Sequence, residues 1–197
     1  MWCLLVFIEL RKKMMNSTVT DPAVRIRIAL TDIERDLTYQ IRHDVFCREQ
    51  KIFSHTDRDA IDAIALPLVA LRVADNVGED QAIEAVGTVR IHEAARGLWI
   101  GSRLAVRNTA RRSAAIGSGL IRLAVGIARA HGCSRFLAHV QSQNVALFER
   151  LHWHSQAEET VHGRSHHLMQ ADLDWYPPVS NGDIGFILPM GLPLRST

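Results

Sequence analysis

The chain has 197 residues, of which 47% are hydrophobic and 22% are charged, a balance typical of one globular domain and not of a disordered or fibrous chain. Its formal net charge of +2 is too small to predict a nucleic-acid-binding protein, which usually carries a basic stripe on one face. The 3 cysteines are too few for a disulfide framework, so we expect a reducing, cytoplasmic location.

The two ends of the chain are expected to lie outside the main domain. The apolar run over residues 1–8 is shorter than the ~18 residues that a membrane span needs. Its basic residues follow it, whereas those of a signal peptide come first. We therefore predict no membrane partner, a disordered or extraneous extension over residues 1–20, a domain over 21–176 and a C-terminal tail over 177–197 that is a loop or an extended arm.

In the first half of the domain, alternating apolar residues predict a strand over 24–30. Thr31 or Asp32 can cap a following helix that runs toward residue 46. The aspartate-bearing stretch over 54–62 indicates a short helix or an ordered loop. Strands over 66–74 and 85–92 form a hairpin-like pair, and a further strand covers 98–107.

In the second half the apolar residues recur with a period of about 3.6 over 116–128, which predicts a long helix with Gly132 at its C-terminal cap. A strand over 136–141, a short helix over 144–152 and strands over 153–162 and 166–173 follow. This order predicts an α/β or α+β domain in which helices flank a mixed sheet of about seven strands.

A basic loop rich in small residues joins the strand over 98–107 to the long helix. Backbone N–H groups at the helix start bind anions readily, and Arg111 or Arg112 can add a forked, charge-assisted contact. Gly117 and Gly119 would let a diphosphate approach the backbone, or would only allow close helix–sheet packing. The loop lacks the Gly-Lys-Ser/Thr ending of a nucleoside-triphosphate loop, and no acidic ribose-binding residue follows in clear position.

Four segments, in order, resemble the GNAT (Gcn5-related N-acetyltransferase) family. Residues 112–117 resemble the Arg/Gln-x-x-Gly-x-Gly/Ala signature, with Ala115 in place of the first glycine. Residues 144–153 resemble the family's Asn-x-x-Ala-x-x-Tyr-Glu-Lys-Leu-Gly-Phe segment, shortened by one residue. Residues 42–50 and 163–169 resemble Arg-x-x-Val-Phe-x-x-Glu-Gln and Gly-x-x-His-x-x-Met of one branch. The resemblance spans residues 24–174 and implies a mostly antiparallel sheet.

The resemblance implies direct transfer of an acyl group, most simply acetyl from acetyl-CoA, to the primary amine of a small molecule. Phe148 stands where the family often has a tyrosine that protonates the leaving thiolate, so another group assists or the thiolate, with a thiol pKa of ~8.5, leaves unaided. The residues implied to contact CoA are Leu104, Ala105, Val106, Arg111, Arg112, Ala115, Ile116, Gly117, Ser118, Gly119, Asn144 and Phe148.

The candidates for a general base that deprotonates the amine are Glu49, His92 and Glu93, with His139 as a further candidate. Each can equally be an ordinary surface or turn residue. We predict no metal site, because the adjacent histidines near residue 166 point to opposite faces of a strand. The aspartates of 54–62 could attract a cationic acceptor or simply be solvated.

Two alternatives to the acetyltransferase hypothesis stay open. Acyl-homoserine lactone synthases also carry an Arg-x-x-Val-Phe segment followed by acidic residues. Ala115 and Phe148 would instead suit a catalytically weak acyl-CoA-binding or interaction module. The sequence does not identify the acceptor or the acyl length, and it leaves a homodimer open.

Overall fold

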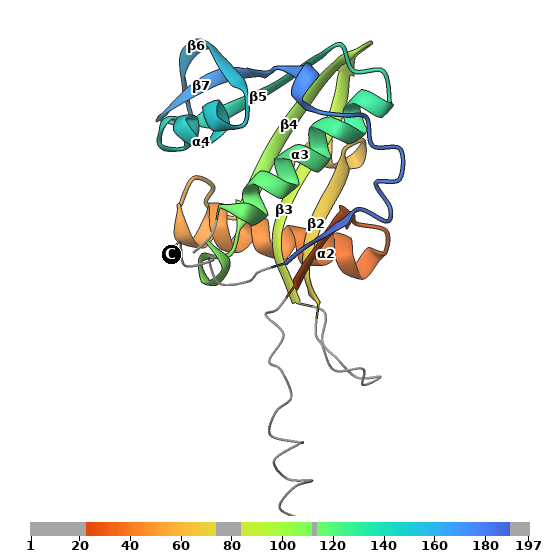
Figure 1. Cartoon of the computed structure of the whole chain (residues 1–197). Helices are drawn as coiled ribbons and strands as arrows, with labels where there is room; N and C mark the ends of the chain where they lie inside the picture. The colour runs from red at the N-terminus through yellow and green to blue at the C-terminus, as the bar shows by residue number, and fades with distance from the viewer. Residues whose placement is uncertain (1–22, 74–83, 112–113, 190–197) are drawn as a thin grey trace, which may run out of the picture.

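The computed structural model describes residues 23–73, 84–111 and 114–189. These residues form one sheet with the strand order β6-β7-β5-β4-β3-β2-β1-β8. Helices α3 and α2 cover opposite faces of it (Figure 1). The β4–β5 pair is parallel, and the other pairs are antiparallel. The predicted mixed, mostly antiparallel sheet flanked by helices is therefore confirmed.

The strands are β1 (Ala23–Ile28), β2 (Leu66–Val73), β3 (Glu84–Ala95), β4 (Leu98–Val106), β5 (Arg135–Gln141), β6 (Trp153–Val161), β7 (Arg164–Ala171) and β8 (Phe186–Leu188). The α-helices are α2 (Asp32–Arg42), α3 (Ala115–Ala130) and α4 (Val145–Arg150). Short 3-10 turns cover Ala60–Ala63, Asn108–Ala110, Ser142–Asn144 and Leu173–Trp175. The boundaries lie close to those that the hydrophobic periodicity predicts. The tail adds one strand to the prediction, because β8 pairs with β1 at the edge of the sheet.

Helix α2 begins at a capping box. The Thr31 hydroxyl accepts a hydrogen bond from the Glu34 backbone N–H at 3.2 Å, and the Glu34 carboxylate accepts one from the Thr31 N–H at 3.3 Å. Beyond Arg42 the predicted helix continues as a π-helix over His43–Glu49, in which the Gln50 N–H donates to the Val45 carbonyl at 2.8 Å. Val45 and Phe46 of this segment share a buried cluster with Ala85 of β3 and Ala105 of β4, in the middle of the sheet.

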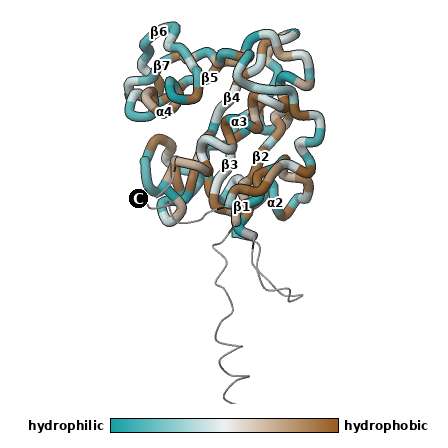
Figure 2. Tube along the Cα trace, in the orientation of Figure 1, coloured by the Kyte–Doolittle hydropathy of each residue, from teal (hydrophilic) through white to brown (hydrophobic). Residues whose placement is uncertain are grey.

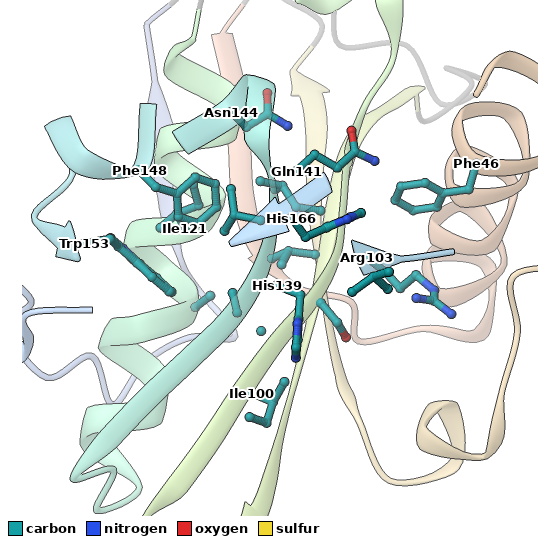
Figure 3. A pocket seen from close by; sticks show the side chains of 18 of the residues that line it. Phe46, Ile100, Arg103, Ile121, His139, Gln141, Asn144, Phe148, Trp153 and His166 are labelled. Atoms are coloured by element: carbon teal, nitrogen blue, oxygen red, sulfur yellow. The ribbon is translucent and has the colours of Figure 1, made fainter. Parts of the chain in front are cut away.

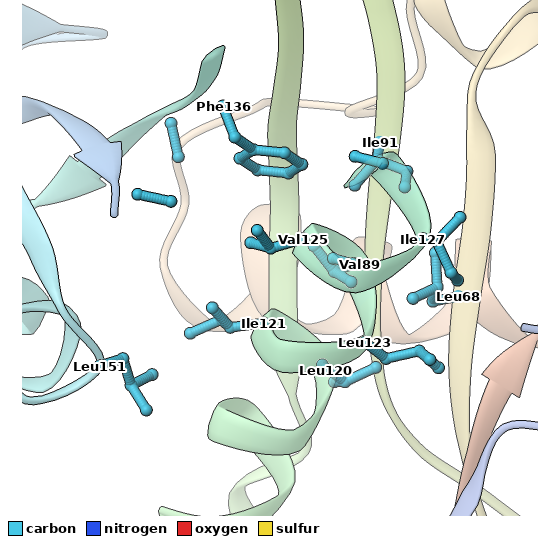
Figure 4. Packing of buried hydrophobic residues seen from close by; sticks show 14 of the residues in the cluster. Leu68, Val89, Ile91, Leu120, Ile121, Leu123, Val125, Ile127, Phe136 and Leu151 are labelled. Carbon is cyan, nitrogen blue, oxygen red and sulfur yellow. The ribbon is translucent and has the colours of Figure 1, made fainter. Parts of the chain in front are cut away.

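Helix α3 fills the opposite face. Its buried residues include Leu120, Leu123 and Ile127, which pack near Leu68 of β2 (Figure 4). Hydropathy follows the same division: apolar residues gather at α3 and β2, and the β6–β7 hairpin is mainly polar (Figure 2). Gly132, with φ +82°, ends the helix as predicted, and its N–H donates to the Arg129 carbonyl at 3.0 Å.

Candidate active site

The site begins where β4 and β5 separate. Their last paired residues are Gly101 and Ala138, although β4 continues to Val106 and β5 to Gln141. The strands lie close at Gly101 because it lacks a side chain: a Cβ there would be 2.9 Å from Cε1 of Phe136. Past this point the facing backbone edges of the two strands are free to bind an extended ligand.

A cavity of about 300 Å³ occupies this separation, within the size range of small-molecule sites (Figure 3). We call it the central cavity. Its lining residues on the α3 side are apolar: Ile121, Ala124, Val125, Phe136, Phe148 and Trp153. Those on the α2 side are more polar and include Phe46, Gln50, Phe53, His139, Gln141 and His166. The cavity therefore reaches both faces of the sheet, so that two reactants can meet from opposite sides.

A β-bulge lies beside the separation point. Thr88 pairs with Ala105 and Arg90 with Ser102, so two residues of β4 oppose Val89 alone. One of them, Arg103, has φ +55°, a conformation that L-residues adopt only at a free-energy cost. The bulge turns Arg103 toward the α2 side, where its guanidinium lies 4.8 Å from the Phe53 ring centroid.

A cluster of ion pairs, in which Arg42, Asp57 and Arg90 are buried, anchors this bulge. Arg103 Nε lies 3.0 Å from a carboxylate oxygen of Asp57, and its Nη2 lies 3.1 Å from Asp59. Arg42 donates from Nε to Asp57 at 2.6 Å and from Nη1 to Asp62 at 2.6 Å. We call Arg42, Arg90, Arg103, Asp57, Asp59 and Asp62 the Arg–Asp cluster.

The Arg–Asp cluster corrects both sequence-based expectations for Asp57, namely that it attracts a cationic acceptor or that it is simply solvated. Asp57 is 2% exposed and pairs with two arginines, so it is neither a solvated residue nor free to attract a cationic acceptor. Burial alone would raise the pKa of Asp62, but hydrogen bonds from Arg42 and Arg90 lower it well below its usual range. The Asp62 carboxylate is therefore charged, and all three aspartates are already paired with arginines.

His139 is the candidate base that the structure places at the cavity. It lines the central cavity, and its Nδ1 lies 3.1 Å from a carboxylate oxygen of Glu159. The other three candidates are not among the described lining residues. Glu49 forms a bidentate ion pair with Arg111, the guanidinium expected to bind phosphate.

The remaining two candidates lie toward the β3–β4 turn. The Glu93 carboxylate accepts a hydrogen bond from the Gly97 N–H at 2.7 Å, as a turn residue does. His92 is 9% exposed, and burial, with the charge of Arg90, lowers its pKa. Among the described residues its Nδ1 has no hydrogen-bond partner.

The loop expected to hold a diphosphate divides into inward and outward positions. Ile116 is buried in the core, and a Cβ on Gly119 would lie 2.6 Å from Ile26, so Gly119 serves helix–sheet packing. A Cβ on Gly117 would meet nothing within 4 Å, and Ser118 and Ala115 are half-buried. Among the described residues, Ala114 at the N-cap of α3 makes no side-chain capping hydrogen bond, and the start of an α-helix is a favourable place for an anion. Arg112 lies outside the described residues.

The residues expected to contact the pantetheine arm also lie in different surroundings. Leu104 lines the central cavity, Ala105 packs in the core on the α2 side, and the Val106 carbonyl accepts from Arg111 Nε at 2.7 Å. Asn144 and Phe148 both line the cavity. Phe148 is 6% exposed and packs edge-to-face on Trp153 at 5.0 Å, so it forms part of the apolar wall.

The described ranges hold no group of three or more His, Cys, Asp or Glu side chains placed to bind a metal ion. No helix within them has both the length and the apolar character to cross a membrane.

The sequence model of the acetyltransferase (GNAT) family matches residues 38–153. No curated protein sequence matches the chain. A Lactobacillus plantarum protein assigned as an N-acetyltransferase has a TM-score of 0.65 and 19% identity over 76% of this chain and 98% of its own.

Two other solved structures are also similar. An acyl-CoA N-acyltransferase from Pseudomonas aeruginosa has a TM-score of 0.59 and 18% identity over 75% of this chain and 98% of its own. A CoA-dependent acyl-homoserine lactone synthase, solved with SAM and isopentyl-CoA, has a TM-score of 0.57 and 16% identity over 77% of this chain and 83% of its own. At such identities the likeness shows the fold alone.

Proposed function

The chain belongs to the acetyltransferase (GNAT) family, and we propose that it transfers an acyl group, most simply acetyl, from a CoA thioester to the primary amine of a small molecule in one direct step. The observation that carries the proposal is the central cavity, which lies where β4 and β5 separate and reaches both faces of the sheet. Thioester and amine can therefore approach the same point from opposite sides.

In this proposal the chain binds and orients the reactants. The free edge of β4 over 102–106 pairs with the amides of the pantetheine arm, and the start of α3, with Arg111, holds the diphosphate. Phe148 and Trp153 exclude water from the thioester. Phe148 cannot protonate the leaving thiolate, so CoA leaves as the thiolate or receives its proton from another group.

A test starts from the purified full chain, with acetyl-CoA or octanoyl-CoA and a panel of L-amino acids, polyamines and aminoglycosides, and measures the release of free thiol. Release above the blank with any amine supports the proposal. CoA binding without turnover across the panel would favour the acyl-CoA-binding module, and failure to bind CoA would overturn both readings.

Matched variants tie any activity to the cavity. Ala138→Phe places a ring in the central cavity and should abolish thiol release, because Ala138 lines it on the α3 side. Ala130→Phe adds the same ring at an exposed position at the end of α3, away from the cavity lining, and should leave thiol release unchanged. Equal loss in both variants would show that the ring acts through folding and not through the cavity.

Acyl-homoserine lactone synthesis is a second candidate. In the Arg-x-x-Val-Phe segment, Arg42 pairs with the acidic residues Asp57 and Asp62, and Phe46 lines the central cavity. The apolar lining of the cavity on the α3 side suits an acyl chain longer than acetyl. SAM therefore belongs in the acceptor panel, with mass spectrometry of the products. An acyl-homoserine lactone formed from octanoyl-CoA and SAM would favour this candidate over the transfer of acetyl to a simple amine.

A further inference from the structure

We propose that His139, oriented by Glu159, is the general base of this site and acts on primary amines that are protonated at neutral pH. The inference rests on the proposed acyl transfer and adds to it the residue that deprotonates the acceptor. His139 is the first residue of β5 beyond the last β4–β5 pair, Gly101 with Ala138. Its imidazole thus lies where the two strands begin to separate.

Strand alternation places this imidazole on the α2 side of the sheet, from which the amine approaches in the proposed reaction. Phe136, Ala138 and Val140 belong to the core on the α3 side, so His139 and Gln141 point to the other face. Gln141 Nε2 donates to the side chain of Gln50, in the segment that follows α2, at 3.0 Å. Figure 3 shows His139 among the side chains that line the cavity.

Glu159 reaches His139 from two strands away. In the sheet register His139 is opposite Leu168 of β7, and Leu168 is opposite Ala157 of β6, so Glu159 lies two residues further along β6 on the same face. Its carboxylate engages Nδ1 at 3.1 Å. That contact assigns the Nδ1–H tautomer and leaves Nε2 as the proton acceptor.

The other titratable side chains that line the central cavity are engaged elsewhere. Arg103 pairs with Asp57 and Asp59. His166 makes a 2.9 Å hydrogen bond from its Nδ1 to the Arg164 carbonyl, and His162 packs edge-to-face on Phe53 at 4.9 Å. Glu159 is therefore the carboxylate that the described structure aims at an imidazole of the central cavity.

His139 can serve as the only base for both proton transfers of the reaction. Nε2 accepts one proton from the acceptor ammonium and passes it to solvent. The amine nitrogen then forms a bond to the thioester carbon, and the C–S bond breaks with its electron pair leaving on the CoA sulfur. Nε2 accepts the second N–H proton and can deliver it to that thiolate, so the net products are amide, CoA thiol and one proton.

Two small probes test the role of base. Ethanolamine is protonated at neutral pH and must lose a proton before it attacks, whereas hydroxylamine is already unprotonated and needs only the later removal of one N–H proton. With acetyl-CoA and the full chain, His139→Gln should lower kcat/KM for ethanolamine by about 10²–10⁴-fold and for hydroxylamine by less than about tenfold. With ethanolamine, kcat/KM of the variant should keep rising with pH toward the pKa of the amine itself, because only the amine that is already unprotonated in solution can then react.

The opposite face of the same strands supplies the control. His167 and Glu158 lie 4.0 Å apart there, and His167 hydrogen-bonds to Ser155. His167→Gln and Glu158→Gln should leave both rates unchanged. Glu159→Gln should lower the ethanolamine rate selectively, as expected of a positioning residue that acts through His139.

Rescue keeps the test decisive if a variant folds poorly. His139 is 46% exposed in its side chain, so added imidazole can enter the space that His139→Ala leaves and should restore the ethanolamine rate. Wild-type turnover with equal rates for His139→Gln, or equal losses for both amines without rescue, would overturn the role of base. Absence of thiol release from wild type with either amine would instead overturn the proposed acyl transfer.

Discussion

Removal of the Asp57 carboxylate should lower the free energy of unfolding by more than the removal of any surface charge. Asp57 is 2% exposed and accepts hydrogen bonds or ion pairs from Arg42 at 2.6 Å and from Arg103 at 3.0 Å. Breaking a buried ion pair from one side costs about 3–5 kcal/mol, because a charge is left buried. Arg42 keeps a second carboxylate, Asp62, at 2.6 Å, so we expect about 3 kcal/mol for Asp57→Ala.

Urea denaturation followed by tryptophan fluorescence measures this loss, and a thermal melt should show a decrease in Tm of about 6–12 °C. Asp36→Ala is the matched control: its carboxylate is 70% exposed and lies 4.0 Å from Arg58, so its loss should change stability by about 1 kcal/mol or less. If the two variants were equally stable, the Arg–Asp cluster would not stabilise the fold in the way argued.

Three further predictions concern the cosubstrate loop and the carboxylates. Gly119→Ala should destabilise the fold by about 1–3 kcal/mol through overpacking. Gly117→Ala should instead stabilise the fold by up to about 1 kcal/mol and weaken CoA binding, which calorimetry measures. Unchanged CoA affinity of Gly117→Ala would place the diphosphate elsewhere. Glu49→Gln should retain turnover and tighten CoA binding, because it frees Arg111; loss of turnover at unchanged CoA affinity would make Glu49 a candidate base again. The pKa of Asp62 is lower in the folded than in the unfolded state, so its contribution is present above about pH 4 and lost as the pH falls further. Urea denaturation between about pH 2 and 6 should show that loss in wild type, and Asp62→Asn should reduce it.

The sequence predicts the elements well because burial and periodicity are linked. The alternation around His139 places that residue on the face away from α3, and the period of the long helix predicts the face of α3 that packs on the sheet. The capping residue Thr31 and the terminal Gly132 also carry their own local signals. Such features depend on neighbours in the chain.

The site depends instead on distant residues. Arg103 reaches Asp57 across 46 positions of sequence, and Arg111 reaches Glu49 across 62, so neither the paired state of the aspartates nor that of Glu49 has a local signal. The proximity of Glu159 to His139 follows from the register of two strand pairs and from a shift in the β6–β7 pairing. Arg103 has a positive φ, which sequence patterns associate with glycine, asparagine or aspartate and not with arginine.

The Arg–Asp cluster and the His139–Glu159 pair have complementary roles in the site. The bulge at Arg103 needs an external anchor, and the charges of Asp57 and Asp59 provide it. Because those carboxylates are neutralised by arginines, they offer little attraction to a cationic acceptor, and an acceptor must be recognised by other groups of the α2 side. The site is therefore better suited to a small amine that gives up its proton to His139 than to a polyamine held by acidic side chains, and the relative rates of amino acids and polyamines in the acceptor panel measure that preference.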